Sequence, residues 1–126
     1  MKVMEANRGK WFIFKEYAIT IATTVDKLNP LDIEVRHIRN ALDAWLKKRA
    51  GKCWRIVVQV TADPADFDKI TAAIKDMADH NPSLKKLHKR LVLFNPQGVQ
   101  CQDIDLNLMQ SAAADPATAK KELGKK

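Results

Sequence analysis

The 126-residue chain lacks the common sequence motifs of phosphate-binding, metal-binding and catalytic sites. Its four glycines are scattered, so there is no glycine-rich phosphate loop. Two cysteines and three histidines show no CxxC, HxxxH or HxH spacing, which argues against a built-in zinc site. A GxSxG nucleophile motif is also missing. We therefore expect a binding protein and not an enzyme, with no metal and no cofactor.

Cysteine usage and hydropathy limit the setting further. Cys53 and Cys101 lie far apart, in segments typical of strands, and we expect two reduced, partly buried thiols. A disulfide would require these strands to be neighbours with a suitable Cα separation. No apolar run approaches membrane-spanning length, and the first ten residues lack the apolar core of a signal peptide. These features predict a cytoplasmic protein without membrane contact.

The clearest pattern in the chain lies in residues 29–60. Large apolar residues recur there at spacings of three and four, as on one face of a helix: Leu31, Val35, Ile38, Leu42 and Trp45. Asn29 and Pro30 are typical of a helix start, and Gly51 is typical of a helix end. The alternating apolar residues in 54–60 then predict a buried strand.

The helical spacing of three and four residues and the alternation typical of strands also predict the other elements. They predict a bent strand over 11–25, a helix starting at 63–64, a short helical segment after 81–82, a strand over 91–94, and a last strand over 99–108. In the last strand the apolar residues change from odd-numbered to even-numbered positions near Gln102. A bulge there would keep both halves of the strand facing the core.

The element order β-α-β-α-(α)-β-β favours an α+β fold: one two-layer domain over residues 10–110, with a mixed sheet and helices on one face. Residues 1–9 are expected to form a loose leader, and residues 111–126 a flexible basic tail. The order resembles that of the C-terminal domain of translation initiation factor 3 and of the Alba chromatin proteins, which bind nucleic acid. The resemblance is confined to the order of elements.

Segregated positive charge is the main functional clue. The net charge is +7, and the basic residues gather on the first helix and in residues 85–90, whereas residues 63–79 are net acidic. A phosphate backbone attracts such cations. The candidate nucleic-acid-binding residues are Arg36, Arg39, Lys47, Lys48, Arg49, Lys52, Lys85, Lys86, Lys89 and Arg90.

These charges also have plainer explanations. Arg39, Asp43 and Lys47 have the spacing of a salt-bridged helix face, and cations near a helix end complement its dipole. The acidic residues that begin at Asp63 fit the start of a helix better than a magnesium site.

The alternative function is a protein–protein interaction module without nucleic-acid binding: an adaptor, a complex subunit or a homodimer. The apolar run at residues 11–14 is expected to fill the core under the first helix, but as an edge strand it could instead pair with a partner or a second copy. Charge patterning does not distinguish DNA from RNA, nor either of them from an acidic protein.

Overall fold

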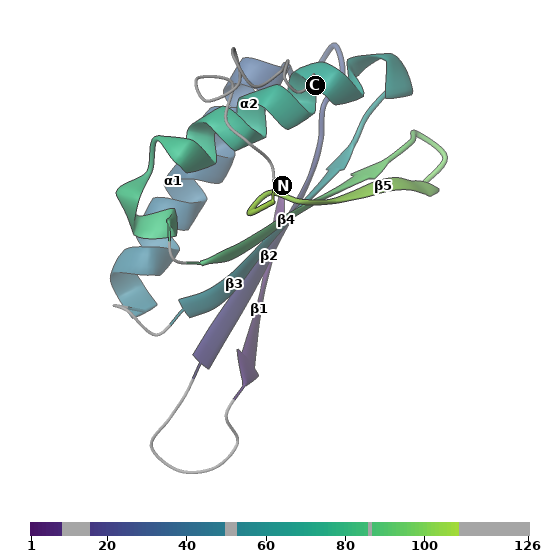
Figure 1. Cartoon of the computed structure of the whole chain (residues 1–126). Coiled ribbons are helices and arrows are strands. Elements are labelled where there is room, and N and C mark those ends of the chain that lie inside the picture. The colour runs from purple at the N-terminus through teal and green to yellow at the C-terminus, as the bar shows by residue number, and fades with distance from the viewer. Residues whose placement is uncertain (9–15, 50–52, 86, 109–126) are drawn as a thin grey trace, which may run out of the picture.

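A computed structural model describes residues 1–8, 16–49, 53–85 and 87–108. Five strands form one mixed sheet, and two helices cover one of its faces (Figure 1). This confirms the predicted two-layer α+β fold. The elements are β1 (Lys2–Arg8), β2 (Glu16–Thr24), α1 (Leu31–Arg49), β3 (Cys53–Thr61), η1 (Pro64–Asp66), α2 (Phe67–Asp79), η2 (Pro82–Leu84), β4 (His88–Phe94) and β5 (Gln100–Asp105).

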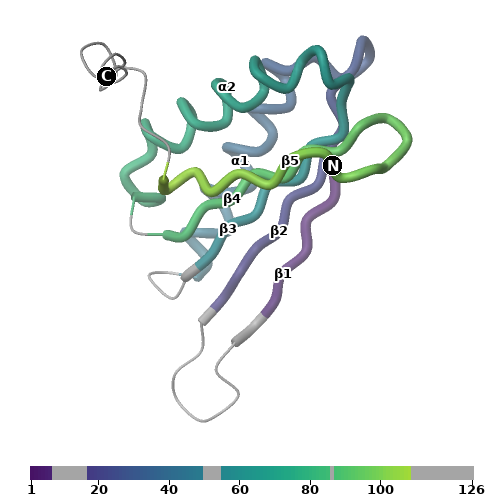
Figure 2. Tube along the Cα trace, turned by 45° about the vertical axis from the view of Figure 1, so that its right-hand side comes forward, coloured from purple at the N-terminus to yellow at the C-terminus, as the bar shows by residue number. Residues whose placement is uncertain are grey.

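The strands lie in the sheet in the order in which they occur in the chain, β1-β2-β3-β4-β5 (Figure 2). The inner strands β2, β3 and β4 are parallel because α1 and α2 each carry the chain back across the sheet. The edge strands β1 and β5 are antiparallel to their neighbours. Both helices therefore end where β3 and β4 begin, and both start at the opposite end of the sheet.

The core lies between the sheet and the helices. The strand register aligns Ile21, Val58, Leu91 and Ile104 in one row across β2 to β5, facing the helices. The buried sides of α1 and α2 fill the space above this row, as their apolar spacings predict: Ile38, Leu42, Trp45, Phe67, Ile70 and Ile74. Each large aliphatic side chain buried in this way contributes about 1.5–3 kcal/mol.

Two sequence expectations differ from the structure at the start of the chain. The loose leader expected over residues 1–9 contains β1, which pairs with β2 along its whole length. The strand expected over residues 11–25 begins at Glu16 as β2, and residues 11–14 lie outside the described residues. The sequence pattern missed β1 because an edge strand is held mainly by backbone pairing and needs little apolar alternation.

The end of the sheet bears out one expectation and corrects another. Leu93 pairs with Gln102 and Phe94 pairs with Gln100, so Cys101 is the extra residue of a bulge near the predicted position. Cys101 is exposed, contrary to the partly buried thiol expected. Its strand β5 is separated from β3, which contains Cys53, by β4, so the two cysteine-bearing strands are not neighbours.

In the part of the chain that the structure describes, no helix has the length and apolar character needed to span a membrane.

Candidate nucleic-acid interface

The two basic segments predicted from the sequence meet at one end of the sheet. α1 finishes at Arg49 just before β3, and η2 finishes at Leu84 just before β4 (Figure 1). β3 and β4 are adjacent and parallel, so their first residues lie at the same end. The side-chain amide of Asn81 donates a 3.1 Å hydrogen bond to Asp43 on α1, which joins the two helical regions. We call this the basic end, and define it by Lys47, Lys48, Arg49, Arg55 and Lys85.

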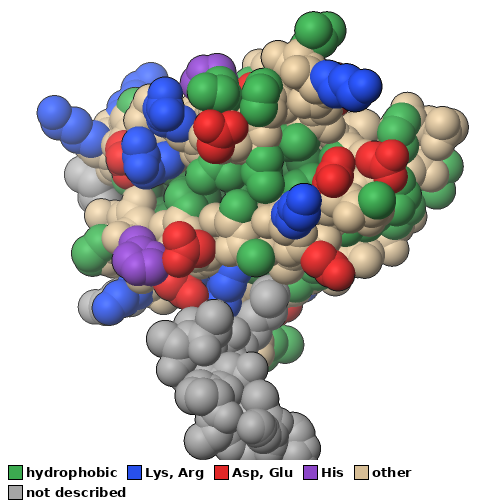
Figure 3. Space-filling view, turned by 90° about the horizontal axis from the view of Figure 1, so that it is seen from above, with side chains coloured by type: hydrophobic (Ala, Val, Ile, Leu, Met, Phe, Trp, Pro, Cys, Tyr) green, Lys and Arg blue, Asp and Glu red, His purple; other side chains and the backbone are tan. Residues whose placement is uncertain are grey.

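Five of the predicted residues are exposed cations. Lys47 and Lys48 occupy the last turn of α1, Lys85 follows η2, and Arg36 and Arg39 lie further back along α1. None of these five forms an ion pair with any other residue in the described ranges. In Figure 3, which looks down on the helices, most of the basic side chains in view gather on the left, where the helices finish.

Arg49 belongs to the same end but is used by the fold. Its Nη2 donates to Glu5 of β1 at 2.6 Å, its Nε bonds to the same carboxylate, and its guanidinium lies 4.4 Å from the centre of the Tyr17 ring. The indole of Trp45 donates to Glu5 as well, at 3.0 Å. The hydrogen bond from Arg49 is the main cause that lowers the pKa of Glu5. Arg49 therefore fastens the end of α1 to the sheet.

Lys89 is buried and lies on the helix side of the sheet. Its Nζ donates to the backbone carbonyls of Leu84 at 2.8 Å and Leu87 at 3.1 Å. Burial lowers the pKa of Lys89, and the charge of Lys75 lowers it further. With 7% of its surface exposed, this residue holds the start of β4 and does not belong to the exposed set. The sequence contained an indication of this burial, because Lys89 is two residues before Leu91 and so points to the same face of the strand.

Arg90 points to the face of the sheet that the helices leave open. Its guanidinium forms an ion pair with Asp103 of β5 at 2.9 Å, so part of its charge is neutralised. Arg55 lies on the same face and pairs in register with His88, whose ring is 3.5 Å from Asp105. The candidate set from the sequence omitted Arg55, although its alternation with Ile56 would have placed it on this face. The remaining candidates, Lys52 and Lys86, lie outside the described residues.

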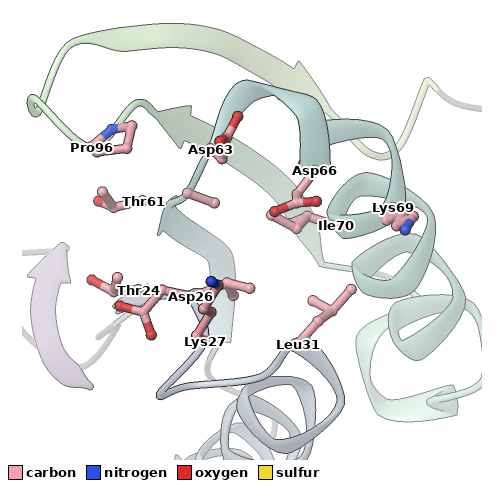
Figure 4. Close-up of a pocket in the computed structure, with 12 residues that line it drawn as sticks. Thr24, Asp26, Lys27, Leu31, Thr61, Asp63, Asp66, Lys69, Ile70 and Pro96 are labelled. Atoms are coloured by element: carbon pink, nitrogen blue, oxygen red, sulfur yellow. The ribbon is translucent and has the colours of Figure 1, made fainter.

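The opposite end of the sheet is rich in carboxylates. A hollow of about 790 Å³ lies where β2 and β3 finish, and Figure 4 shows Asp26, Asp63 and Asp66 around it, with Lys27 and Lys69. The Asp63 carboxylate accepts the backbone N–H of Ala65 at 2.9 Å, which confirms the predicted role of Asp63 as a helix cap.

Asp26 has an equivalent role after β2. Its carboxylate accepts the backbone N–H groups of Asn29 at 2.8 Å and Leu28 at 2.9 Å. These bonds, with that from Asn29 first, lower the pKa of Asp26. Over the described ranges, no three His, Cys, Asp or Glu side chains are grouped as a metal site would require. The acidic end is thus largely explained by local capping.

The topology accounts for the separation of charge. Helices that all start at one end and finish at the other favour carboxylates at their starts and cations at their ends. The dipole favours charges near the helix ends, but it does not account for Arg36 and Arg39, which lie more than one turn from either end of α1. Comparison of the chain with protein-family models, curated proteins and solved structures finds no match.

Proposed function

We propose that this protein binds nucleic acid in the cytoplasm, without catalysis, through the basic end and the outer side of α1. One observation carries this proposal: Lys47 and Lys48 of α1 and Lys85 after η2 lie at the same end of the sheet, and none of them forms an ion pair with a carboxylate among the described residues. Exposed cations of this kind attract phosphates, and the attraction weakens steeply with salt because binding releases counterions.

Arg36 and Arg39 lengthen the proposed surface along the helix. At a rise of 1.5 Å per residue, α1 spans about 16 Å between Arg36 and Lys47. Each strand of a B-form duplex rises about 3.4 Å per nucleotide along the helix axis, so this length corresponds to roughly five nucleotides of such a strand. The groups recognised are backbone phosphates, which DNA and RNA share, and we expect affinity with little sequence preference.

The test compares two charge-matched double variants. Lys48→Glu/Lys85→Glu reverses two exposed lysines at the basic end, and Lys27→Glu/Lys69→Glu reverses two exposed lysines at the acidic end. Fluorescence anisotropy with labelled single-stranded RNA, single-stranded DNA and duplex DNA, over a salt series, measures the affinity of each. The first variant should bind about tenfold more weakly and reduce the salt slope by about 2, since each lysine contributes about 1.

The control variant should lose less than about threefold, through the change in overall charge alone. Equal losses in the two variants would show that binding follows net charge, and would contradict the proposed interface. The proposal would also fail if none of the three probes bound the unmodified protein at low salt.

A further inference from the structure

A groove runs between α1 and α2 on the outer side of the helix layer. Its volume is about 850 Å³, and the residues that form its floor are apolar: Leu31, Val35, Ala73, Met77 and Pro82. In Figure 3 apolar side chains line a hollow that acidic side chains border. The groove exists because Ala73 is too small to close the seam between the helices, which leaves its larger neighbours half-buried.

The rim of the groove is acidic in a protein of net charge +7. Three carboxylates line it, Asp32, Asp43 and Asp76, against one arginine, Arg39. His80 also lines the groove, and its pKa is raised by its hydrogen bond to the Asp76 backbone carbonyl and by the Asp76 carboxylate. The rim therefore carries a net negative charge that would repel phosphates, so the groove is a different kind of surface from the proposed nucleic-acid surface, which it meets at Arg39.

The groove adjoins a second acidic region. Leu31 lines both this groove and the hollow at the acidic end, which Asp26, Asp63 and Asp66 line together with Lys27 and Lys69 (Figure 4). An occupant lying along the seam would therefore meet apolar surface below it and an excess of carboxylates on either side. Contiguous exposed apolar surface with a polar rim marks interaction sites on soluble proteins.

We propose that this groove docks a basic amphipathic helix of a partner protein, with its apolar side on Ala73 and Met77 and its Lys or Arg side chains near Asp32 and Asp76. Helix-in-groove recognition uses apolar anchors three and four residues apart, and opposite charges on the rim set the orientation. This interaction goes beyond the proposed nucleic-acid binding.

A second copy of the chain is a poorer occupant. The large apolar side chains that are exposed in the described part of the chain lie on strands and connecting segments, and none is on a helix: Met1, Val3, Met4, Leu28, Val99 and Leu108. The described part of another copy therefore presents no helix with a large exposed apolar side chain to the groove. The charge of the rim favours a basic helix from a different protein.

The probe is an 18-residue fluorescein-labelled peptide of leucine and lysine, patterned as an amphipathic helix. Its control is the same pattern with glutamate in place of lysine. The matched variants are Ala73→Arg, which fills the groove with a cation, and Ala72→Arg, which adds the same side chain at an exposed neighbouring position. The leucine–lysine peptide should bind the unmodified protein. Ala73→Arg should weaken this binding by about tenfold, and Ala72→Arg by less than about twofold.

A second pair of variants tests the charge without altering the floor. Asp32 and Asp68 are both exposed carboxylates in the first turn of a helix, but only Asp32 lines the groove. The change to lysine should therefore affect the helix dipole similarly at both positions. Asp32→Lys should weaken peptide binding by about fivefold, more at low salt than at high salt, and Asp68→Lys by less than about twofold. This pair decides the question even if Ala73→Arg does not fold.

Several results would overturn the proposal. Equal binding of the leucine–glutamate peptide would remove the role of the acidic rim. Equal effects of the matched variants would place the peptide elsewhere. If sedimentation showed a dimer that Ala73→Arg abolishes and Ala72→Arg preserves, the occupant would be a second copy. Nucleic-acid affinity should not fall in any of these four variants, so failure of this proposal is separable from failure of the proposed function.

Discussion

The two ends of the parallel strands carry opposite charges for different reasons. At the acidic end, Asp26 and Asp63 each accept backbone N–H groups and so complete a turn or a helix start. At the basic end, Arg49 and Lys89 are similarly used by the fold, but Lys48 and Lys85 have no such partner in the described ranges. The fold accounts for most of the carboxylates and for only some of the cations.

This difference separates the charges that the fold uses from the charges that stay exposed. A carboxylate at a helix start and a cation at a helix end both gain from the dipole, so position alone does not identify a binding residue. Burial and hydrogen bonding do separate the groups, because a cation that holds two carbonyls inside the protein cannot reach a phosphate. The comparison predicts that substitutions at equivalent positions of the two ends will fall into distinct classes.

The largest effect is expected at Lys89. Lys89→Ala removes two hydrogen bonds to buried carbonyls and the packing of the side-chain methylenes, and should lower the free energy of unfolding by about 2–4 kcal/mol. Lys85→Ala, at an exposed position of the same segment, should change it by less than about 0.5 kcal/mol. Urea unfolding followed by circular dichroism measures both. Similar values for the two variants would break the division into structural and exposed cations.

A smaller effect is expected at the acidic end. Asp63→Ala removes the acceptor for the Ala65 N–H and should cost about 1 kcal/mol, whereas Asp63→Asn keeps an acceptor and should cost a few tenths. Thermal unfolding of the two variants in parallel tests this. A loss as large for asparagine as for alanine would mean that the charge of Asp63, and not its capping bond, matters to the fold.

The smallest effect concerns Glu5 and depends on pH. Its pKa is lowered in the folded protein from an ordinary value of 4.5. Its stabilising contribution is therefore complete above the unfolded value and is lost as pH falls below 4.5 through the folded value. Glu5→Gln should lower the Tm at pH 7 and change it less at pH 3. An equal change at both pH values would show that the Glu5–Arg49 pair adds no charge-dependent stability.

The sequence predicted the layers and the helices because their signals are local. The apolar residues from Leu31 to Trp45 all lie in one helix, so their spacing can be read from that segment alone. The bulge near Gln102 was indicated by the change from odd-numbered to even-numbered apolar positions within one strand. Lys89 was assigned to a basic segment because its strand was expected to start at Leu91, whereas β4 starts at His88. A strand that begins three residues earlier turns a surface lysine into a core one.

Long-range pairs were not accessible from local patterns. Glu5 and Arg49 are 44 residues apart, and nothing near either one identifies the other. The groove is a second case, because it depends on how α1 lies against α2 and on the small size of Ala73. Sequence reasoning could place each of these residues on a helix or a strand, but only the packing of those elements brings them together.

The strand order has a consequence for how the chain reaches this structure. Each strand pairs only with strands that adjoin it in the chain, so a mixed sheet is built here without any distant segment being inserted between earlier ones. Each pairing then closes a short loop and costs little chain entropy. Folding rates rise as contacts become more local. The unit from β2 through α1 to β3 can therefore act as a template. β4 and then β5 can pair with this template as each strand leaves the ribosome.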